Sequence, residues 1–481
     1  MRQPERSACL IARVNTCRGR DARATGTILV AVLVVTALAA MVAMSLLYRM
    51  RAEVSAAAAV GAHQQAYAVA QSGVQRAIAV LQASPGDAGA WWDNPDLFRN
   101  QYVCSDARGD VWYFTLYASN PADSSAPRSG IIDEASKINL NTATAEMLAR
   151  LPNMTPELVD SLMVWRGGDP LKYPDGATEE YYNQLPVPYV MKKGPLATME
   201  ELLLVKAFTG SIVYGEDYNL NGILDKNEDD GDDSFPPDNR DGVLDTGLMG
   251  VATVISYERN VDSSGKARVN LNGDPAALAS AGLPAQTLQF LQVYRAEGGT
   301  LKHPSQLLNM RYESKQQKNP DGSAKVFPSG VNPQNLAKVL DKCTTAAGGT
   351  RTPVLGLVNV NTASKQVLSL LPGFDENLAQ QVLDARGTAE GDQKSSIAWL
   401  VAQNVLEPDK FKEVAPYLTA RSLQFRVRCV GFGAPSGRFC VVEAVVDLAS
   451  GTPTTVYTRD LTHLGMPVPV VPEQLPGPTL K

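Results

Sequence analysis

Histidine and excess positive charge are both scarce in this sequence. Only three histidines, His63, His303 and His463, occur among 481 residues, and they lie far apart. This spacing leaves little for a histidine-based zinc site or a serine–histidine–aspartate triad. The formal net charge is −6, whereas nucleic-acid binding usually needs a basic surface. The composition therefore argues against an enzyme and against a nucleic-acid-binding protein.

Length and uneven charge indicate a chain of several parts. With 44% hydrophobic and 20% charged residues, the 481-residue chain should form two or three domains. Residues 216–245 hold eleven acids and two bases, a local charge of −9, so the rest of the chain sums to +3. Residues 1–26 carry six arginines and two acids. A basic start and one acidic segment therefore need separate explanations.

A long apolar run lies near the N-terminus. From Ile28 to Leu47 there are 20 residues without a charge, and a helix of that length spans about 30 Å, the hydrocarbon thickness of a bilayer. Arg18, Arg20 and Arg23 should keep the short leader cytoplasmic. The alternatives are a cleaved secretory signal and a buried core helix, but the run is long for a signal and no A-x-A site follows. We therefore expect a single membrane span.

The same helix should continue beyond the membrane. The chain from Ala52 to Leu81 is alanine-rich and free of proline. Its apolar residues fall near i, i+3, i+4 spacing, as on one face of an amphipathic helix: Ala66, Val69, Ala70, Val74, Ala77, Ile78 and Leu81. One helix from Thr27 to about residue 82 is expected, ended by Pro85-Gly86.

The basic leader, the glycine at position 26, the apolar run and the long helix together resemble the N-terminus of type IV pilins and pseudopilins. In that family a prepilin peptidase cleaves after the glycine, here Gly26, and methylates the new N-terminus, here Thr27. A glycine lets the backbone approach a protease without a side chain in the way. The segment from Tyr67 to Arg76 also resembles the helix of the K-type minor pseudopilin of type II secretion.

The body of the chain contains an internal repeat. Ile138-Asn-Leu-Asn141-Thr-Ala recurs 220 residues later as Val358-Asn-Val-Asn361-Thr-Ala, and a degenerate third copy begins at Val269. Asparagine and threonine are good helix-start residues, and the leucines that follow would lie on one helix face. A leucine-proline pair then marks a turn before a second short helix. This pattern is typical of helix-hairpin-helix units.

Helix-hairpin-helix units often bind DNA through a glycine-rich turn. The turns here, at Leu151-Pro152, Leu283-Pro284 and Leu371-Pro372, lack the two glycines that would let a phosphate sit close, and no lysine-arginine cluster surrounds them. We therefore expect the repeats to pack a helical domain. The stretch from Ile132 to Ala143 resembles the start of the helical domain inserted in the K-type pseudopilin.

The acidic segment contains a calcium-loop motif. Residues 217–228 fit D-x-[DN]-x-[DN]-G-x5-E at every position, and Gly222 permits the sharp turn. The ligands would be side-chain oxygens and one carbonyl, from Asp217, Asn219, Asn221, Ile223, Asp225 and Glu228. A second copy with Asp241 and Asp245 starts at Pro237, which cannot ligate by side chain; Asp229, Asp230, Asp232 or Asp233 could supply missing ligands. The alternative for either copy is a solvated acidic loop, and no flanking helices of EF-hand length are evident.

Alternating and β-branched segments predict strands at residues 111–117, 251–257, 423–431, 439–448 and 455–462. The last three are spaced as a meander. Cys429 and Cys440 flank the turn between two of these strands almost symmetrically, so we expect a disulfide between them on the oxidising side of the membrane. Cys104 and Cys343 would then remain as a second pair.

The chain is therefore identified, by resemblance, as a K-type minor pseudopilin of a type II secretion system, with an α+β fold. The expected parts are a prepilin leader, a transmembrane and amphipathic helix, the first part of a head with a pseudopilin-type antiparallel sheet, an inserted helical domain with helix-hairpin-helix repeats, the C-terminal sheet of the head and a loose proline-rich tail. Their residue ranges are 1–26, 27–82, 83–136, 137–420, 421–465 and 466–481.

The resemblance implies a structural role without catalytic residues. Such a protein sits in the inner membrane with its bulk in the periplasm, starts assembly of the pseudopilus at its tip, and supports export of folded proteins across the outer membrane. Its partners would be other minor pseudopilins, the major pseudopilin and prepilin peptidase; calcium is the expected cofactor, and no nucleic acid is expected. The alternatives are a membrane-anchored DNA-uptake protein and a tethered surface hydrolase.

The fifth residue after the expected cleavage site bears on position in the filament. In ordinary pilins this residue is a glutamate that neutralises the N-terminus of the neighbouring subunit above. Here it is Ala31, and no acid occurs between Thr27 and Leu47. A subunit without this acid cannot neutralise a neighbour above it, which favours a place at the tip.

Overall fold

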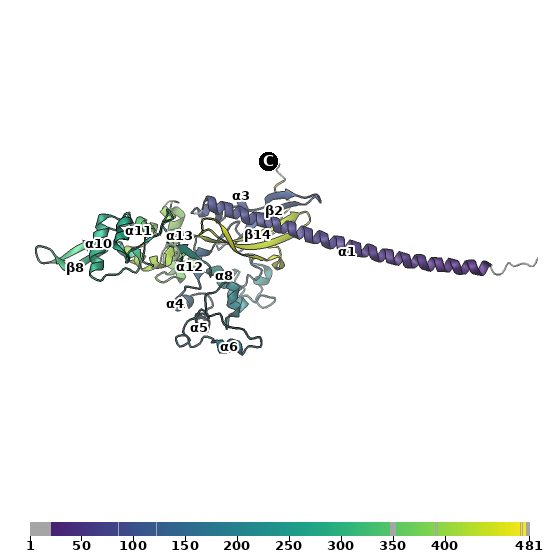
Figure 1. The fold of residues 1–481 in the computed structure, drawn as a ribbon, viewed down its shortest axis with the longest axis horizontal. Coiled ribbons are helices and arrows are strands. Elements are labelled where there is room, and N and C mark those ends of the chain that lie inside the picture. The colour runs from purple at the N-terminus through teal and green to yellow at the C-terminus, as the bar shows by residue number, and fades with distance from the viewer. Residues whose placement is uncertain are drawn as a thin grey trace, which may run out of the picture. The chain divides into compact units, whose positions relative to one another are not determined.

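The chain forms two compact units, residues 1–65 and residues 66–481. The computed structural model describes residues 21–84, 86–121, 123–346, 353–389, 391, 393–471, 473 and 475–477, with the backbone alone for residues 21–26. Figure 1 shows the elements in chain order by colour. The expected leader lies largely outside the described residues.

Helix α1 (Asp21–Ala83) contributes to both units. In the first unit its apolar side chains face outward, with Ile28 62% and Leu33 65% exposed. The helix from Thr27 onward is long and apolar enough to cross a membrane, by length and composition. In the second unit six of the seven predicted core positions of α1, from Ala66 to Leu81, are buried, and Ile78 is half-buried.

The head of the second unit is an antiparallel sheet with strand order β1-β2-β14-β15-β16, and β3 also pairs with β14. Its strands are β1 (Gln101–Ser105), β2 (Val111–Tyr117), β3 (Ile132–Asp133), β14 (Gln424–Ala434), β15 (Phe439–Asp447) and β16 (Thr454–Asp460). Short helices α2 (Ala88–Trp91) and α3 (Pro95–Phe98) connect α1 to this sheet. The predicted antiparallel sheet and long apolar helix are confirmed.

The two faces of the sheet carry different partners, because successive side chains of a strand point to opposite faces. On the face we call the helix face, α1 packs so closely that a Cβ on Gly73 would meet Cys429 and Phe114. The opposite face, called the loop face, presents Tyr113, Val430 and Phe432 to a separate apolar cluster. Helix α1 therefore covers one face of the sheet, and the apolar cluster covers the other.

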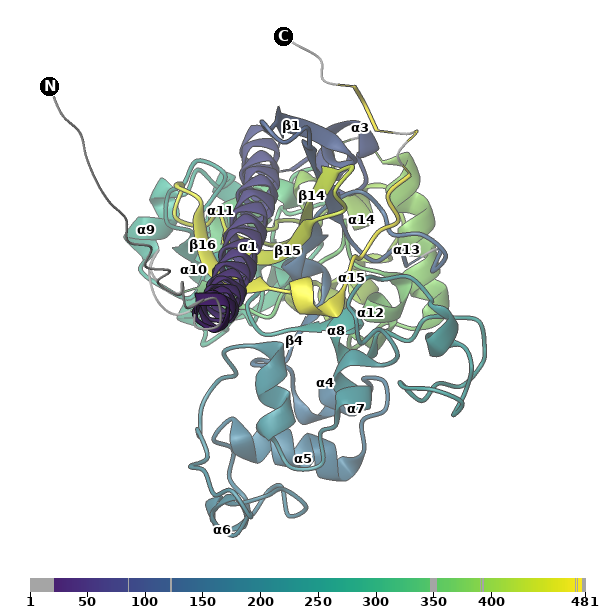
Figure 2. The same ribbon diagram turned by 90° about the vertical axis from the view of Figure 1, so that its right-hand side faces the viewer.

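The inserted domain begins and ends on neighbouring strands. It leaves the head after β3 and returns at β14, where Asp133 pairs with Phe425 and Ile132 with Arg426. In Figure 2, α4 to α7 lie at the bottom, α9 to α11 on the left and α12 and α13 on the right, with the yellow strands of the sheet between the last two groups. A large domain can be inserted here because the two strands that flank it are hydrogen-bonded to each other.

The three predicted repeats form three modules, residues 138–253, 269–344 and 358–419. Their helix pairs are α4 (Ala145–Leu148) with α5 (Pro156–Trp165), α9 (Pro275–Ser280) with α10 (Ala285–Ala296), and α12 (Lys365–Leu370) with α13 (Glu376–Thr388). Each module opens with a short strand that pairs in parallel with a closing strand: β4 (Ile138–Asn139) with β5 (Ala252–Thr253), β7 (Val269–Asn270) with β10 (Cys343–Thr344), and β12 (Val358–Asn359) with β13 (Leu418–Thr419).

Modules 1 and 2 have the same pattern of internal hydrogen bonds. In module 1 the first asparagine, Asn139, accepts the N–H of Asn141 at 2.9 Å, and Asn141 exchanges two hydrogen bonds with the backbone of Leu196. Asn270 and Asn272 repeat this arrangement in module 2, with Leu301 in place of Leu196. The Asn-x-Asn repeat is thus a structural device that ties the opening strand to the rest of its module.

The remaining elements are short. They are α6 (Glu179–Asn183), α7 (Gly210–Tyr214), α8 (Gly247–Val251), α11 (Leu336–Lys342), α14 (Trp399–Ala402), α15 (Pro408–Val414), and the strand pairs β6 (Tyr257–Arg259) with β11 (Pro353–Leu355) and β8 (Arg311–Lys318) with β9 (Ala324–Pro328). The predicted strand at 251–257 is wrong: Val251 ends α8, and only Ala252–Thr253 pairs before β6 begins at Tyr257.

Candidate functional site: two acidic loops on the sheet

The first acidic loop, residues 217–228, folds as its motif predicts. Leu220 and Gly222 take left-handed backbone conformations, with φ of 56° and 70°. The N–H of Asn221 donates to Asn219 Oδ1 at 3.0 Å, and the N–H of Ile223 donates to Asn221 Oδ1 at 2.6 Å. A Cβ on Gly222 would lie 2.8 Å from the Cα of Ser119, so this position needs glycine for space as well as for φ.

The carboxylates of this loop are crowded and buried. Asp217 and Glu228 are 3% and 2% exposed. Burial, together with the negative charges of Asp217 and Asp225, raises the pKa of Glu228 to about 7. Burial also raises the pKa of Asp217 above its usual value, against the opposing effect of Arg428. Ionised carboxylates placed this way repel one another, and a bound cation would remove the repulsion.

The residues fit a calcium ion. Asp225 Oδ2 accepts the side-chain N–H groups of Asn219 and Asn221 at 2.8 and 2.9 Å, so these three side chains lie within hydrogen-bonding distance of one another. The amide oxygens of the same asparagines each accept one backbone N–H and keep a second lone pair. Oxygen donors of this kind, three carboxylates and two amides with the Ile223 carbonyl, are the ligands that calcium prefers.

The first loop is also anchored to the head. Leu220, 4% exposed, packs into the apolar cluster on the loop face with Tyr113, Tyr117 and Phe432. Its carbonyl accepts a hydrogen bond from Arg428 Nη1 at 3.1 Å, and the N–H of Leu224 donates to Ser124 O at 2.9 Å. The first loop is therefore tied to the sheet through its backbone and Leu220.

The second acidic loop, residues 237–245, repeats the local conformation. Arg240 and Gly242 have φ of 55° and 73°, like Leu220 and Gly222. In the first loop the glycine N–H donates to Asp217, but in the second loop the N–H of Gly242 donates to Asp229 Oδ1 at 3.1 Å. Asp229 therefore accepts the glycine N–H in the second loop, because Pro237, at the position of Asp217, has no side-chain acceptor.

The second loop differs in burial and in its contacts. Asp241 is exposed and accepts the N–H of Val243, while Asp245 accepts the N–H of Gly247. The two loops meet where Glu216 N–H donates to the Asp245 carbonyl at 2.7 Å and Glu216 Oε2 accepts the Asp245 N–H at 3.0 Å. The flanking elements are α7, five residues long, and a 3-10 turn at Lys226–Glu228, so helices of EF-hand length are not present in this described segment.

A buried ion cluster, which the sequence analysis missed, lies beside the first loop on the same face. Glu443 on β15 is fully buried and accepts hydrogen bonds from Arg426, Arg428 and Arg459 at 2.7 to 2.9 Å. The three guanidinium groups hold the pKa of Glu443 well below its usual range. Arg426 also pairs with Glu134 at 2.6 Å and Arg459 with Glu200 at 2.6 Å, which ties the sheet to module 1. A glutamate in the otherwise apolar run of β15 was the available signal.

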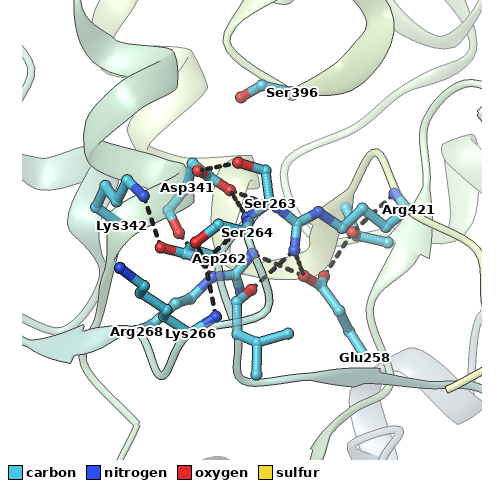
Figure 3. A network of polar contacts seen from close by, with 12 residues as sticks. Glu258, Asp262, Ser263, Ser264, Lys266, Arg268, Asp341, Lys342, Ser396 and Arg421 are labelled. Carbon is cyan, nitrogen blue, oxygen red and sulfur yellow. Dashed lines mark hydrogen bonds and ion pairs between the residues drawn. The ribbon is translucent and has the colours of Figure 1, made fainter. Parts of the chain in front are cut away.

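A second polar network joins residues 258–268, between modules 1 and 2, to the ends of modules 2 and 3 and to Arg421 (Figure 3). Glu258 accepts from Arg268 at 2.7 Å and from Thr419 at 2.7 Å, and Arg421 reaches both Glu258 and Asp341. Lys342 pairs with Asp262 at 2.6 Å, and the hydrogen bonds that Asp262 accepts hold its pKa well below its usual value. These contacts are internal to the insert and form no catalytic constellation.

The predicted cysteine pairing does not match the strand register. Cys429 lies opposite Val442, and Cys440 lies opposite Gly431, so the two are offset by two residues along the hairpin. The turn closes with Phe432 opposite Phe439, which moves its centre toward Cys440 from the position that the prediction assumed. Both thiols are free and buried in the structure. Cys104 lies on β1 of the head and Cys343 on β10 of module 2.

The predicted cleavage site lies within α1. Gly26 and Thr27 are helical, and the side chain of Thr27 is exposed. The structure therefore places the Gly26–Thr27 bond at the start of the apolar segment of α1.

Residues 134–214 match the family model of the type II secretion system protein K. The sequence-based resemblance to the K-type minor pseudopilins is thereby confirmed, over a segment that runs from the end of β3 to α7 and stops just before the first acidic loop. The chain also aligns with a chain of the crystal structure of the GspK-GspI-GspJ complex from the type 2 secretion system of enterotoxigenic Escherichia coli. That alignment has 11% identity and a TM-score of 0.38, and covers 82% of this chain and 96% of the other. No curated protein matches the sequence.

Proposed function

We propose that this protein is a structural minor pseudopilin that stands at the tip of a type II secretion pseudopilus, starts its assembly and supports export of folded proteins. The observation that carries the proposal is the match of residues 134–214 to protein K of that system. This segment belongs to a domain inserted in a head whose antiparallel sheet packs on the second half of a long apolar helix. Inner-membrane anchoring by α1, with the bulk in the periplasm, fits this role.

Processing by prepilin peptidase is the first test. Mass spectrometry of the mature protein should find a methylated N-terminus at Thr27. A mature N-terminus beyond Leu47 would instead indicate a conventional secretory signal and contradict a pseudopilin. A Gly26→Val variant, which adds a β-branched side chain next to the bond, should remain at full length.

The proposed tip position rests on Ala31 and on the size of the inserted domain, because so bulky a body would clash if it were stacked in the middle of a thin filament. Because Ala31 cannot neutralise the N-terminus of a subunit above it, the protein suits a place with no subunit above. Gold-labelled antibodies on sheared pseudopili should mark one end at about one copy per filament; label along the shaft would contradict the tip position. Other minor pseudopilins, the major pseudopilin and prepilin peptidase are the partners that this role requires.

The three helix pairs, which we interpret as helix-hairpin-helix modules, serve packing in this proposal. Their arginines form hydrogen bonds with backbone carbonyls of their own module. Arg166 donates to the carbonyls of Ala143 and Asn141 at 2.9 and 2.7 Å, and Arg386 donates to the carbonyl of Ala363 at 2.8 Å. Guanidinium groups held in this way are not directed at a phosphate backbone. DNA uptake, the alternative function, predicts a salt-sensitive gel shift with duplex DNA, and we expect none.

Calcium is the proposed cofactor of the acidic loops. The first loop would hold an ion through Asp217, Asn219, Asn221, Asp225, Glu228 and the Ile223 carbonyl. The second would use Asp241 and Asp245, with Asp229 in the position that Pro237 leaves open. A bound ion supplies charge neutralisation, and the residues of the first loop then hold Leu220 against the head.

A further inference from the structure

The described part of the C-terminal tail, which was predicted as a loose segment, lies on the head. Met466, Val468, Val470 and Leu475 pack against the apolar cluster of the loop face, beside Leu220. Pro467 is buried among these contacts, whereas Pro469 and Val471 are exposed. Residues 466–471 form neither helix nor strand. Residues 466–471 are therefore an irregular segment that packs against the loop face of the sheet.

The surface beneath the tail is aromatic. Tyr113 stacks on Phe432, with ring centroids 5.7 Å apart, and Tyr102 meets Tyr113 edge-on at 6.3 Å. The hydroxyl of Tyr113 donates a hydrogen bond to the carbonyl of Pro476 at 2.8 Å. Burial, with a smaller effect of Tyr102, raises the pKa of this hydroxyl above its usual value.

The tail has the composition that such a surface binds. Five of its 16 residues are proline, at positions 467, 469, 472, 476 and 478. Proline-rich segments are extended before they bind, so they lose little conformational entropy, and they dock on grooves lined by tyrosine and other aromatic residues. A tyrosine hydroxyl that donates to a carbonyl of the segment fixes its position.

The described part of the tail contacts the sheet mainly through apolar side chains. Among the described residues of 466–477, the hydrogen bond from Tyr113 is the one that joins the tail to the sheet, and no strand pairing occurs. A segment without ladder hydrogen bonds can leave without breaking the sheet. Its advantage over a competing segment comes from attachment to the same chain, which gives it a high effective concentration.

We propose that the aromatic half of the loop face, formed by Tyr102, Tyr113 and Phe432, is a docking site for a proline-rich extended segment of a partner protein. The chain's own tail occupies this site and has to be displaced before the partner binds. This proposal does not depend on the place of the protein in a pseudopilus, and its test uses neither secretion nor filament assembly.

The test separates the tail from the folded chain. A protease site inserted at Gly465 in the full chain allows the tail to be cut after folding and removed by gel filtration; near-ultraviolet circular dichroism of the cut and uncut chains checks that the head stays folded. The probe is a fluorescent synthetic peptide with the sequence of residues 466–481. We expect the cut chain to bind it, and the uncut chain to bind it at least tenfold more weakly.

Two controls decide whether the site recognises proline and Tyr113. Tyr113→Phe should weaken peptide binding by the cut chain about fivefold, because one hydrogen bond is lost while the ring stays. A peptide with its prolines replaced by alanine should bind at least fivefold more weakly than the original. The proposal is overturned if the folded, cut chain does not bind the peptide, if cut and uncut chains bind equally, or if the alanine peptide binds as tightly.

Discussion

The two acidic loops share one sequence pattern and one backbone conformation, yet they differ in what surrounds them. In the first loop Asp217 and Glu228 are buried, and Leu220 packs into the head. In the second loop the residue that matches Leu220 is Arg240, which is exposed and pairs with Asp233. The comparison teaches that the motif sets the turn, while the residue at its fourth position and the burial of its acids decide whether the loop is tied to the rest of the protein.

The largest expected effect comes from the fourth position of each loop. Leu220→Ala removes a buried side chain from the cluster on the loop face and should lower the free energy of unfolding by about 2–4 kcal/mol. Arg240→Ala, at the matching exposed position, should change it by less than about 0.5 kcal/mol. Urea unfolding of the full chain in detergent measures both. Equal effects would mean that the two loops are anchored alike.

A smaller effect should appear in the pH dependence of stability without calcium. The folded-state pKa of Glu228, about 7, lies above its usual value of 4.5, so the folded state binds this proton more tightly than the unfolded state. Its contribution is fully present below pH 4.5 and is lost as the pH rises through 7. The melting temperature in chelator should therefore fall between pH 5 and pH 8.

The variant Glu228→Gln separates this contribution from others of the same sign. Burial also raises the pKa of Asp133 to about 6, so some loss of stability with rising pH should remain. The part removed by Glu228→Gln belongs to the loop, on the order of 1 kcal/mol. Saturating calcium should remove the same part in the wild type, because the ion replaces the proton. Identical pH profiles of variant and wild type in chelator would contradict the assignment.

The smallest effect concerns the second loop. Asp229→Ala removes the carboxylate that accepts the Gly242 N–H and should weaken a second, lower-affinity calcium-binding event about tenfold, with little change in stability. Asp232→Ala, an exposed acid three residues on, is the matched control and should leave that event unchanged apart from a small loss of attraction. Isothermal titration calorimetry distinguishes the two; equal weakening would show that only net charge matters.

Much of the head could be predicted from the sequence because its signals are local. The period of α1 identified its buried residues, and β-branched alternation located β2, β14, β15 and β16 to within a few residues. The Asn-x-Asn repeat also located the three modules. Their closing strands, such as Ala252–Thr253, were missed because two residues are too few to show a period.

The contacts that make the first loop a site were not predictable, since they join residues far apart in sequence. Nothing in residues 217–228 indicates that Leu220 would meet Phe432, or that Arg428 would donate to the Leu220 carbonyl. The cysteine register was wrong because the hairpin geometry depends on the turn, and a shift of its centre by one residue offsets a pair by two. The tail was taken as loose because prolines exclude regular structure, although they do not exclude packing on an aromatic surface.

The most direct measurement of the central claim is the effect of calcium on three versions of the full chain in detergent. At free calcium one hundred times its Kd, the wild type should gain about 2.7 kcal/mol of stability and melt at a higher temperature. The first-loop variant Asp217→Ala/Glu228→Ala should lose most of that gain, and the second-loop variant Asp241→Ala/Asp245→Ala should keep most of it. An unchanged calcium response in the first-loop variant would contradict the account.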